Sequence, residues 1–333
     1  MVAQLVRLWS RVAVAAFLAV SFGAAAWAQG GPVRIAYGDV PSAESLHLLI
    51  ALEKMKERGV KLLLITVKSE DLATQAVVGG DAEIGVGTPY AAMQRVQVPI
   101  RMFYQLSTLR FFPVINTDTY KGWKDLNDQI FTVHSRGSGT EAIMMLIAKK
   151  EGIKFKSLSY VPGSEARALA MLRGDIKATI VDAPNRRLIQ EKGGNKFLFL
   201  PMGDTKATDD ALFARKDFLE KNAATVDIMV EELLKVWREI KKNPGYVVAE
   251  RARYKLLPDL PADLAKDIEP YFKEAAGTTV YPVNGGDAAS IKDDFEFFSL
   301  SGAIKGEPAK LKVEDFWHMQ PLDKAIKKLG RQS

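Results

Sequence analysis

The sequence predicts an α/β protein of two lobes, each a mostly parallel sheet flanked by helices, with a helical C-terminal extension. Short apolar runs typical of strands alternate with segments typical of helices, and such alternation indicates parallel βαβ units. The alternation begins at Val33 and starts again at Ile130. From about Phe218 onward, the patterns are mostly helical.

In the first half of the chain, the strand patterns are residues 33–38, 60–67, 82–87 and 100–108. The helix patterns between them are residues 42–59, 69–80 and 88–96. Ser42 and Thr88 are suited to capping the starts of their helices, Pro89 fits a first helical turn, and Gly59 ends the first helix. These elements predict the first lobe.

The pattern then repeats with strands at residues 130–134, 158–162, 177–182 and 196–201. The helices of this second series are residues 139–152, 164–174 and 183–194. The longest C-terminal helix patterns are residues 225–243, 261–277 and 288–302. We therefore expect residues 29–110 with 205–333 to form lobe 1 and residues 111–204 to form lobe 2. The chain crosses between them at 107–116 and again where it returns after residues 197–201.

Two stretches share one design, which indicates that the lobes have similar wiring. In each, a helix ends in Gly-Asp, a short strand and a polar residue follow, and a proline opens the next helix. Gly80-Asp81 corresponds to Gly174-Asp175, and Pro89 corresponds to Pro184. The alternative is that any two βα units look alike at this level of detail.

The N-terminal segment, residues 1–28, has the features of a cleaved signal peptide. Arg7 and Arg11 precede an apolar core at residues 12–20, and Ala26-Trp27-Ala28 is a small-x-small cleavage site. The apolar core is short for a membrane anchor, which is the alternative interpretation. Because the chain contains no cysteine, it lacks the residue that would carry a lipid anchor. We therefore expect a periplasmic protein.

Charge and composition exclude several classes of protein. The formal net charge is +6, but basic and acidic residues are interleaved, and no basic stripe with stacking aromatic residues is present. Nucleic-acid binding is therefore not expected. The mild positive charge would help to attract a small anion. A chain of this length can bury a sufficient core without disulfides.

The stretch "SRGSGTEA", residues 135–142, lies between a strand pattern and a helix pattern and fits G-x-G-x-x-A. A dinucleotide site also needs an acidic residue about twenty positions later, at the end of the next strand. The first acidic residue in that region is Glu165, which lies beyond that strand. A nucleotide P-loop is excluded because no Gly-Lys-Ser/Thr follows the glycines.

The same stretch is suited to binding an anion at the start of a helix, where free N–H groups point outward. The side chains of Ser135, Ser138 and Thr140 add hydroxyl groups, and Arg136 adds a cation that can hold a carboxylate, phosphate or sulfonate. The alternative is that Ser138 or Thr140 only caps the helix. Capping and ligand binding are compatible with each other.

Three other loops follow strand patterns and are expected at the same cleft, because ligands of open α/β sheets bind beyond the carboxyl ends of strands. These loops contain residues 37–42, residues 87–90 and Asp182. Asp182 can also serve as a helix cap. No catalytic motif or metal-ligand spacing is present, so we expect neither catalysis, nor a metal, nor a cofactor.

Several stretches in order resemble periplasmic solute-binding proteins of the nitrate/sulfonate/taurine ABC-importer family, whose relatives bind thiamine-pyrimidine precursors. They are "VRIAYGDVPSAE", "VVGGDAEIGVGTP", "WKDLNDQIFTVHSRGSGTEA", "ALAMLRGDIKATIVDAP" and "AIKKLG". The resemblance implies the two-lobed type II periplasmic-binding fold. It also implies ligand contacts at Gly38, Asp39, Thr88, Ser135, Gly137, Ser138, Thr140 and Asp182, to which the residue pattern adds Arg136.

The function implied is capture of a small anionic organic solute, such as a sulfonate, carboxylate, nitrate-like ion or pyrimidine precursor, and its delivery to a membrane permease. The protein is expected to act as a monomer. Two alternatives stay open. "RGSGTE" also resembles the glycine loop of receptors for TRAP transporters, although "YGDVPSAE" lacks the long glycine-rich first loop of that class. The fold is also shared by pyrimidine-precursor synthases, which are enzymes.

Overall fold

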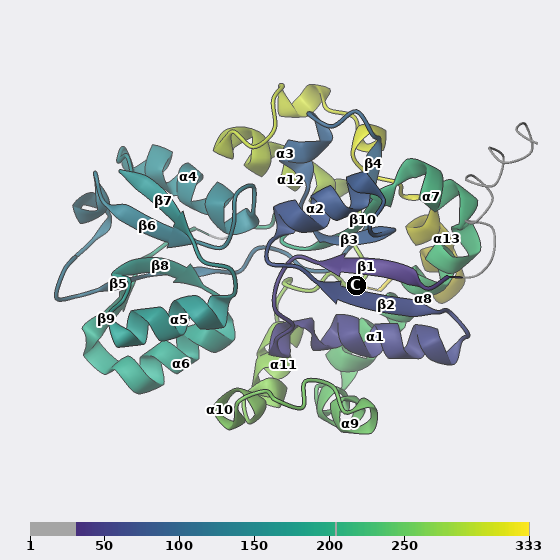
Figure 1. Ribbon diagram of the computed structural model, residues 1–333, viewed down its shortest axis with the longest axis horizontal. Helices are drawn as coiled ribbons and strands as arrows, with labels where there is room; N and C mark the ends of the chain where they lie inside the picture. Colours follow the sequence, from purple (N-terminus) through teal and green to yellow (C-terminus); the bar gives the residue numbers. More distant parts are fainter. Residues whose placement is uncertain (1–30, 204, 333) are drawn as a thin grey trace, which may run out of the picture. The chain divides into compact units, whose positions relative to one another are not determined.

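The computed structural model describes residues 31–203 and 205–332 (Figure 1). The expected signal peptide, residues 1–28, lies outside the described residues. In the described part of the chain, no helix has both the length and the apolar character needed to cross a membrane.

The first sheet contains parallel strands and one antiparallel strand. Its members are β1 (Val33–Tyr37), β2 (Leu62–Thr66), β3 (Ile84–Gly87), β4 (Ile100–Gln105) and β10 (Ala211–Arg215). Their order is β2-β1-β3-β10-β4 (Figure 1). Strand β1 is parallel to β2 and β3, whereas β10 is antiparallel to β3 and β4.

The second sheet repeats this arrangement. Its strands are β5 (Phe112–Asn116), β6 (Ile130–Val133), β7 (Ser157–Tyr160), β8 (Ala178–Val181) and β9 (Phe197–Phe199). Their order is β7-β6-β8-β5-β9, with β6 parallel to both neighbours and β5 antiparallel to both of its own. The order β2-β1-β3 in the first sheet corresponds to β7-β6-β8 in the second, and each set of three is followed by an antiparallel strand, β10 or β5. The predicted similarity of wiring is therefore confirmed.

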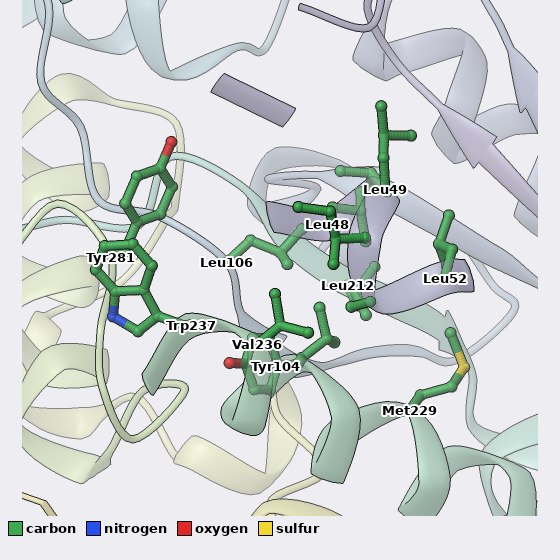
Figure 2. Close-up of a cluster of buried hydrophobic side chains, with 14 of the residues drawn as sticks. Leu48, Leu49, Leu52, Tyr104, Leu106, Leu212, Met229, Val236, Trp237 and Tyr281 are labelled. Carbon is green, nitrogen blue, oxygen red and sulfur yellow. The ribbon is translucent and has the colours of Figure 1, made fainter. Parts of the chain in front are cut away.

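Helices cover both faces of the first sheet. One face carries α1 (Leu46–Glu57) and α8 (Ala223–Lys242), and the other carries α2 (Glu70–Gly79), α3 (Tyr90–Met93) and α12 (Ala288–Ser301). Figure 2 shows leucines of α1 beside Leu212 of β10 and Val236 of α8. The other C-terminal helices are α7 (Lys216–Lys221), α9 (Gly245–Tyr254), α10 (Ala262–Ala265), α11 (Ile268–Ala276) and α13 (Gln320–Leu329).

The second sheet has α4 (Gly139–Glu151) on one face and α5 (Ser164–Arg173) with α6 (Ala183–Gly193) on the other (Figure 1). The two Gly-Asp sequences noted above have the same role in both lobes. Gly80 and Gly174 are the left-handed C-caps of α2 and α5, with φ of 86° and 81°. Glycine adopts this conformation without the steric cost that a Cβ would add.

The two chain segments that join the sheets pair with each other. We name them the connecting ribbon, residues 106–109 and 207–210. The Leu109 amide donates to the Ala207 carbonyl at 2.8 Å, and the Asp209 amide donates to the Ser107 carbonyl at 2.9 Å. Part of the expected first crossing, residues 112–116, is instead strand β5. The division into lobes at residues 110/111 and 204/205 is kept as a proposal.

A buried carboxylate holds the connecting ribbon against α12. Asp294 is fully buried, and its two oxygens accept hydrogen bonds from the Thr208 amide at 2.6 Å, the Thr208 hydroxyl at 2.7 Å and the Tyr90 hydroxyl at 2.6 Å. Burial raises the pKa of Asp294 to about 7. Because the ribbon and α3 are both tied to this one side chain, Asp294 fixes how they meet.

Candidate functional site

A cavity of about 120 Å³ lies where loops from both sheets meet. Its lining includes the loops that follow β1, β6, β7 and β8, together with part of the connecting ribbon and residues of α1 and α11. We name it the strand-end cavity. Its position at the carboxyl ends of parallel strands is the place where this class of sheet binds ligands.

The wall of the strand-end cavity is rich in carboxyl groups. Those that line it are Asp39, Glu44, Glu70, Glu165, Asp182, Asp209 and Asp210. The guanidinium groups that line it belong to Arg110 and Arg167. The acidic groups therefore outnumber the basic groups among the described lining residues, which is the opposite of what an anion site needs.

Seven of the nine residues predicted from the sequence line one of two cavities, whereas Ser135 and Ser138 line neither. Gly38, Asp39, Thr140 and Asp182 line the strand-end cavity. A second cavity, of about 430 Å³ and bounded by α2 and α3, is lined by Thr88, Arg136 and Gly137. The structure thus brings together only part of the expected set.

Thr88 differs from its expected role as a helix cap. Helix α3 begins at Tyr90 with Pro89 as its N-cap. The Thr88 hydroxyl instead donates a hydrogen bond to the backbone carbonyl of Asp209, and its amide donates to Glu70 Oε2 at 2.9 Å. Thr88 therefore joins β3 to the connecting ribbon and to α2.

Arg136 does not supply its charge to the strand-end cavity, contrary to the expectation. Its guanidinium lies over the ring of Tyr160, with the central carbon 5.5 Å from the ring centroid. The direction of a side chain that leaves a tight turn depends on the local backbone, which spacing in the sequence does not reveal. The predicted cation of the anion site is therefore absent from this wall.

Most polar groups of the turn before α4 bond within the chain, but the buried hydroxyl of Ser135 has no partner among the described residues. The Ser138 hydroxyl donates to the Ser135 carbonyl at 2.8 Å and accepts from the Glu141 amide, so Ser138 is the N-cap of α4. The Thr140 hydroxyl accepts from the His134 amide at 3.0 Å, and the Gly137 amide donates to Glu141 Oε2 at 2.6 Å. Helix capping, which the sequence left open, is thus what this turn does.

Carboxylates of the protein itself face the helix starts that could otherwise bind an anion. Asp209 Oδ1 lies 3.4 Å from the position that a Cβ on Gly139 would take, at the first residue of α4. Asp39 Oδ1 lies 3.7 Å from the corresponding position on Gly163, the N-cap of α5. Asp182 caps α6 directly. Positive helix ends are therefore already matched by negative side chains.

His134 connects loops that follow three different strands. Its Nε2 donates to the Gly38 carbonyl at 3.2 Å, after β1, and its Nδ1 accepts from the Gly163 amide at 3.2 Å, after β7. Burial lowers the pKa of His134, so the imidazole is neutral near pH 7. Acceptance at Nδ1 requires this neutral form, so the bonds and the direction of the pKa shift agree.

One end of the cavity is built from aromatic groups around the backbone carbonyl of Glu44. The Tyr281 hydroxyl donates to the Glu44 carbonyl at 3.0 Å and bonds to the Tyr271 hydroxyl at 2.7 Å. His47 Nδ1 donates to the same carbonyl at 2.8 Å. Tyr281 lies beside Trp237 in the core, with ring centroids 4.5 Å apart (Figure 2). This end is thus fixed by the main hydrophobic core.

Arg167 is the most deeply buried cation of the site, with 1% of its surface exposed. Its Nε donates to the Ile180 carbonyl and its Nη1 to the Val161 carbonyl, both at 2.9 Å. Burial lowers its pKa to about 10, and the nearby charges of Asp39, Asp182 and Asp209 partly oppose that shift. Arg167 is therefore a counter-ion for acids from both lobes.

Burial raises the pKa of Asp210 to about 7, with a further contribution from Asp39, and raises the pKa values of Glu44, Glu70 and Asp209 well above their ordinary range. Between pH 6.5 and 8 the folded protein consequently holds protons that the unfolded chain has released. Stability should therefore fall as pH rises through this window.

We expect the free energy of unfolding to be about 1–3 kcal/mol higher at pH 6.5 than at pH 8. Below pH 6.5, neutral buried histidines such as His47, whose pKa is lowered to about 4, oppose the trend. Urea denaturation at several pH values measures the slope, and Asp210→Asn should flatten it, whereas Asp118→Asn, at an exposed site, should not. A stability that rises from pH 6.5 to pH 8 would contradict the assignment.

Sequence reasoning did not identify Asp209, Asp210, Arg167 and His134 as site residues. The signal for the acidic pair was present, since adjacent acids stand directly before the apolar run "ALFA" at residues 211–214. That run was not recognised as strand β10, so its amino end was not placed at the site. His134 is the last residue of the predicted strand 130–134, as Asp182 is of the strand 177–182, and could have been found by the same rule.

The two sheets have the same strand order and are joined by a pair of crossings. Their loops meet at a cavity beyond the ends of the parallel strands. These features define the two-lobed type II periplasmic-binding fold. The chain belongs to the NMT1/THI5-like family, whose model matches residues 44–246. A search of curated proteins gives no match.

Solved structures share this fold at low sequence identity. One from Bordetella bronchiseptica RB50 has a TM-score of 0.73 and 20% identity, covering 91% of this chain and 99% of that one. The periplasmic nitrate-binding protein NrtA from Synechocystis PCC 6803 has a TM-score of 0.65 and 13% identity, covering 90% and 89%. The alkanesulfonate-binding protein SsuA from Xanthomonas axonopodis pv. citri, bound to MOPS, has a TM-score of 0.63 and 14% identity, covering 84% and 96%.

Proposed function

We propose that the protein is the periplasmic solute-binding component of an ABC-type importer, which captures a small organic solute and delivers it to a membrane permease. The observation that carries this proposal is the strand-end cavity, whose wall comes from loops of both sheets. Proteins of the same fold include a nitrate-binding and an alkanesulfonate-binding protein. The N-terminal segment expected to direct export supports a periplasmic location.

The acid-rich wall does not favour the anionic solute expected from the sequence. Of the solute classes considered, a pyrimidine precursor fits better, because it carries no negative charge and offers N–H groups to carboxylates. The strand-end cavity is also close in size to one that holds benzene, about 150 Å³. A compact solute with a single ring or a short chain is therefore the size that we propose.

Two other functions remain as candidates. A TRAP-transporter receptor would bind its solute in a similar cleft but deliver it to a different permease. An enzyme would need a group able to do chemistry. No cluster of His, Cys, Asp and Glu suited to a metal ion is found among residues 31–203 and 205–332. Screening for turnover of any bound solute separates an enzyme from a receptor.

A thermal-shift screen over sulfonates, carboxylates, nitrate, amines and pyrimidines tests the proposed function. A receptor should gain several degrees in melting temperature with at least one compound, because binding to the folded state stabilises it by mass action. If no compound raises the melting temperature and none co-purifies with protein taken from the periplasm, the proposed function is wrong.

We expect the solute found in that screen to reduce the radius of gyration in small-angle scattering, because contacts from both sheets are made together only when the cleft is closed. His134→Leu removes the hydrogen bond to the Gly38 carbonyl and should weaken this response. His318→Leu, at a histidine outside the strand-end cavity, is the matched control. Identical scattering curves with and without the bound solute would exclude closure.

A further inference from the structure

The charge of the strand-end cavity is not balanced by its own basic groups. Arg167 already donates to the Ile180 and Val161 carbonyls. Arg110, the other guanidinium in the wall, forms an ion pair with Glu274. The charge of Arg167 is also shared among Asp39, Asp182 and Asp209, and no basic group among the described residues contributes to the raised pKa of Asp210, so this acid of the connecting ribbon has no cation of its own. A positively charged ligand would supply one.

Buried hydrogen-bond acceptors without partners also favour a ligand that carries N–H groups. His47 is 8% exposed and Asn185 is 4% exposed, and both line the cavity. His47 Nδ1 donates to the Glu44 carbonyl, so its Nε2 is an acceptor, and this atom has no partner among the described residues. The Asn185 amide nitrogen donates to Asp182, which leaves its Oδ1 as an acceptor without a partner.

Unpartnered buried acceptors are costly, so the wall favours a ligand that brings N–H donors. One unpartnered donor also belongs to this wall, Nη1 of Arg110. It suits an oxygen or ring nitrogen at one end of the ligand. The wall as a whole thus fits a molecule with several N–H donors and at most one acceptor group.

We infer that the solute is a compact organic cation, carrying an ammonium or amidinium group that lies against Asp209 and Asp210. This inference rests on the proposed function and specifies its substrate class. We take the cation to be organic, because the cavity has room for a small molecule and no group of acids and histidines suited to a metal ion is found among the described residues. An amidinium offers paired N–H groups to a carboxylate, as a guanidinium does.

The test uses ligands of matched shape and different charge. Calorimetry at pH 8 compares benzamidinium, benzamide and benzoate, and then acetamidinium, acetamide and acetate, each with the purified protein. The cation of each set should bind at least tenfold more tightly than its neutral and anionic counterparts. In parallel, the small molecule released by denaturing protein purified from the periplasm is identified by mass spectrometry.

Variants locate the binding charge. Asp210→Asn keeps the side-chain shape and should reduce cation affinity at least tenfold. Asp118→Asn makes the same change of net charge at an exposed position outside the cavity and should leave affinity unchanged. Melting curves of both variants establish that they are folded. Equal cation affinity for all three proteins would overturn the assignment to Asp210.

The outcomes separate this inference from the proposed function. A co-purifying cation, or tighter binding of the cationic probes, supports both. Binding of benzoate, acetate or a co-purifying anion in preference to cations overturns the charge inference and leaves the receptor function standing. Absence of any co-purifying molecule together with absence of binding by every probe overturns both.

Discussion

Replacing Arg167 by methionine is expected to lower the free energy of unfolding by about 3–5 kcal/mol, as removal of one partner from a buried charged network does. The substitution leaves the carbonyls of Val161 and Ile180 without their donors. It also removes the counter-ion from the acids around it. Chemical denaturation measures the loss.

Arg173→Met is the matched control, because Arg173 lies on the same helix but is exposed, where it pairs with Asp175. That change should cost less than about 1 kcal/mol, as exposed ion pairs do. If Arg167→Met were no more destabilising than Arg173→Met, the network around Arg167 would contribute nothing to stability.

The second large effect is expected at Asp294. Asp294→Ala should lower the free energy of unfolding by about 3 kcal/mol or more, because it leaves a buried amide and two buried hydroxyls without their acceptor. The groups affected belong to Thr208 and Tyr90. Since Thr208 lies in the connecting ribbon, ligand affinity should fall as well.

Asp293→Ala provides the control, because Asp293 is the exposed neighbour on α12. It should change stability by less than about 0.5 kcal/mol. Asp294→Asn should be intermediate, since it keeps one acceptor oxygen but places an NH₂ group beside donors. Urea denaturation of all three variants checks the order, and a loss for Asp293→Ala as large as that for Asp294→Ala would contradict it.

The parallel strands could be predicted because each is followed by a helix with a recognisable start and stop. Strands β5 and β10 were missed because each begins where the chain has just crossed between the sheets, whereas β4 and β9, which also have antiparallel neighbours, precede a crossing and were predicted from their apolar runs. The proline of "FPVIN" also suggests a connection, since proline is rare within sheets. Yet Pro113 pairs with Ile180 inside the sheet, and its carbonyl accepts from the Leu200 amide at 2.9 Å.

The failure to recognise strand β10 also explains why Asp209 and Asp210 were not predicted as site residues. The rule that ligands lie beyond the carboxyl ends of parallel strands placed Gly38, Thr140 and Asp182 at the cavity. An antiparallel strand presents its amino end at that edge, so the residues before β10 also belong there. Asp209 and Asp210 are those residues, and they reverse the expected charge of the site.

The connecting ribbon has a consequence for how binding is transmitted. Asp209 and Asp210 are part of the backbone pairing that links the sheets and also part of the cavity wall. The residues proposed to contact the solute are thus also residues of the connection between the sheets. We therefore expect a charged solute that displaces these carboxylates to act on the pairing between the sheets directly. A solute that filled the rest of the cavity but did not engage this pair would occupy the protein without setting the angle between the sheets.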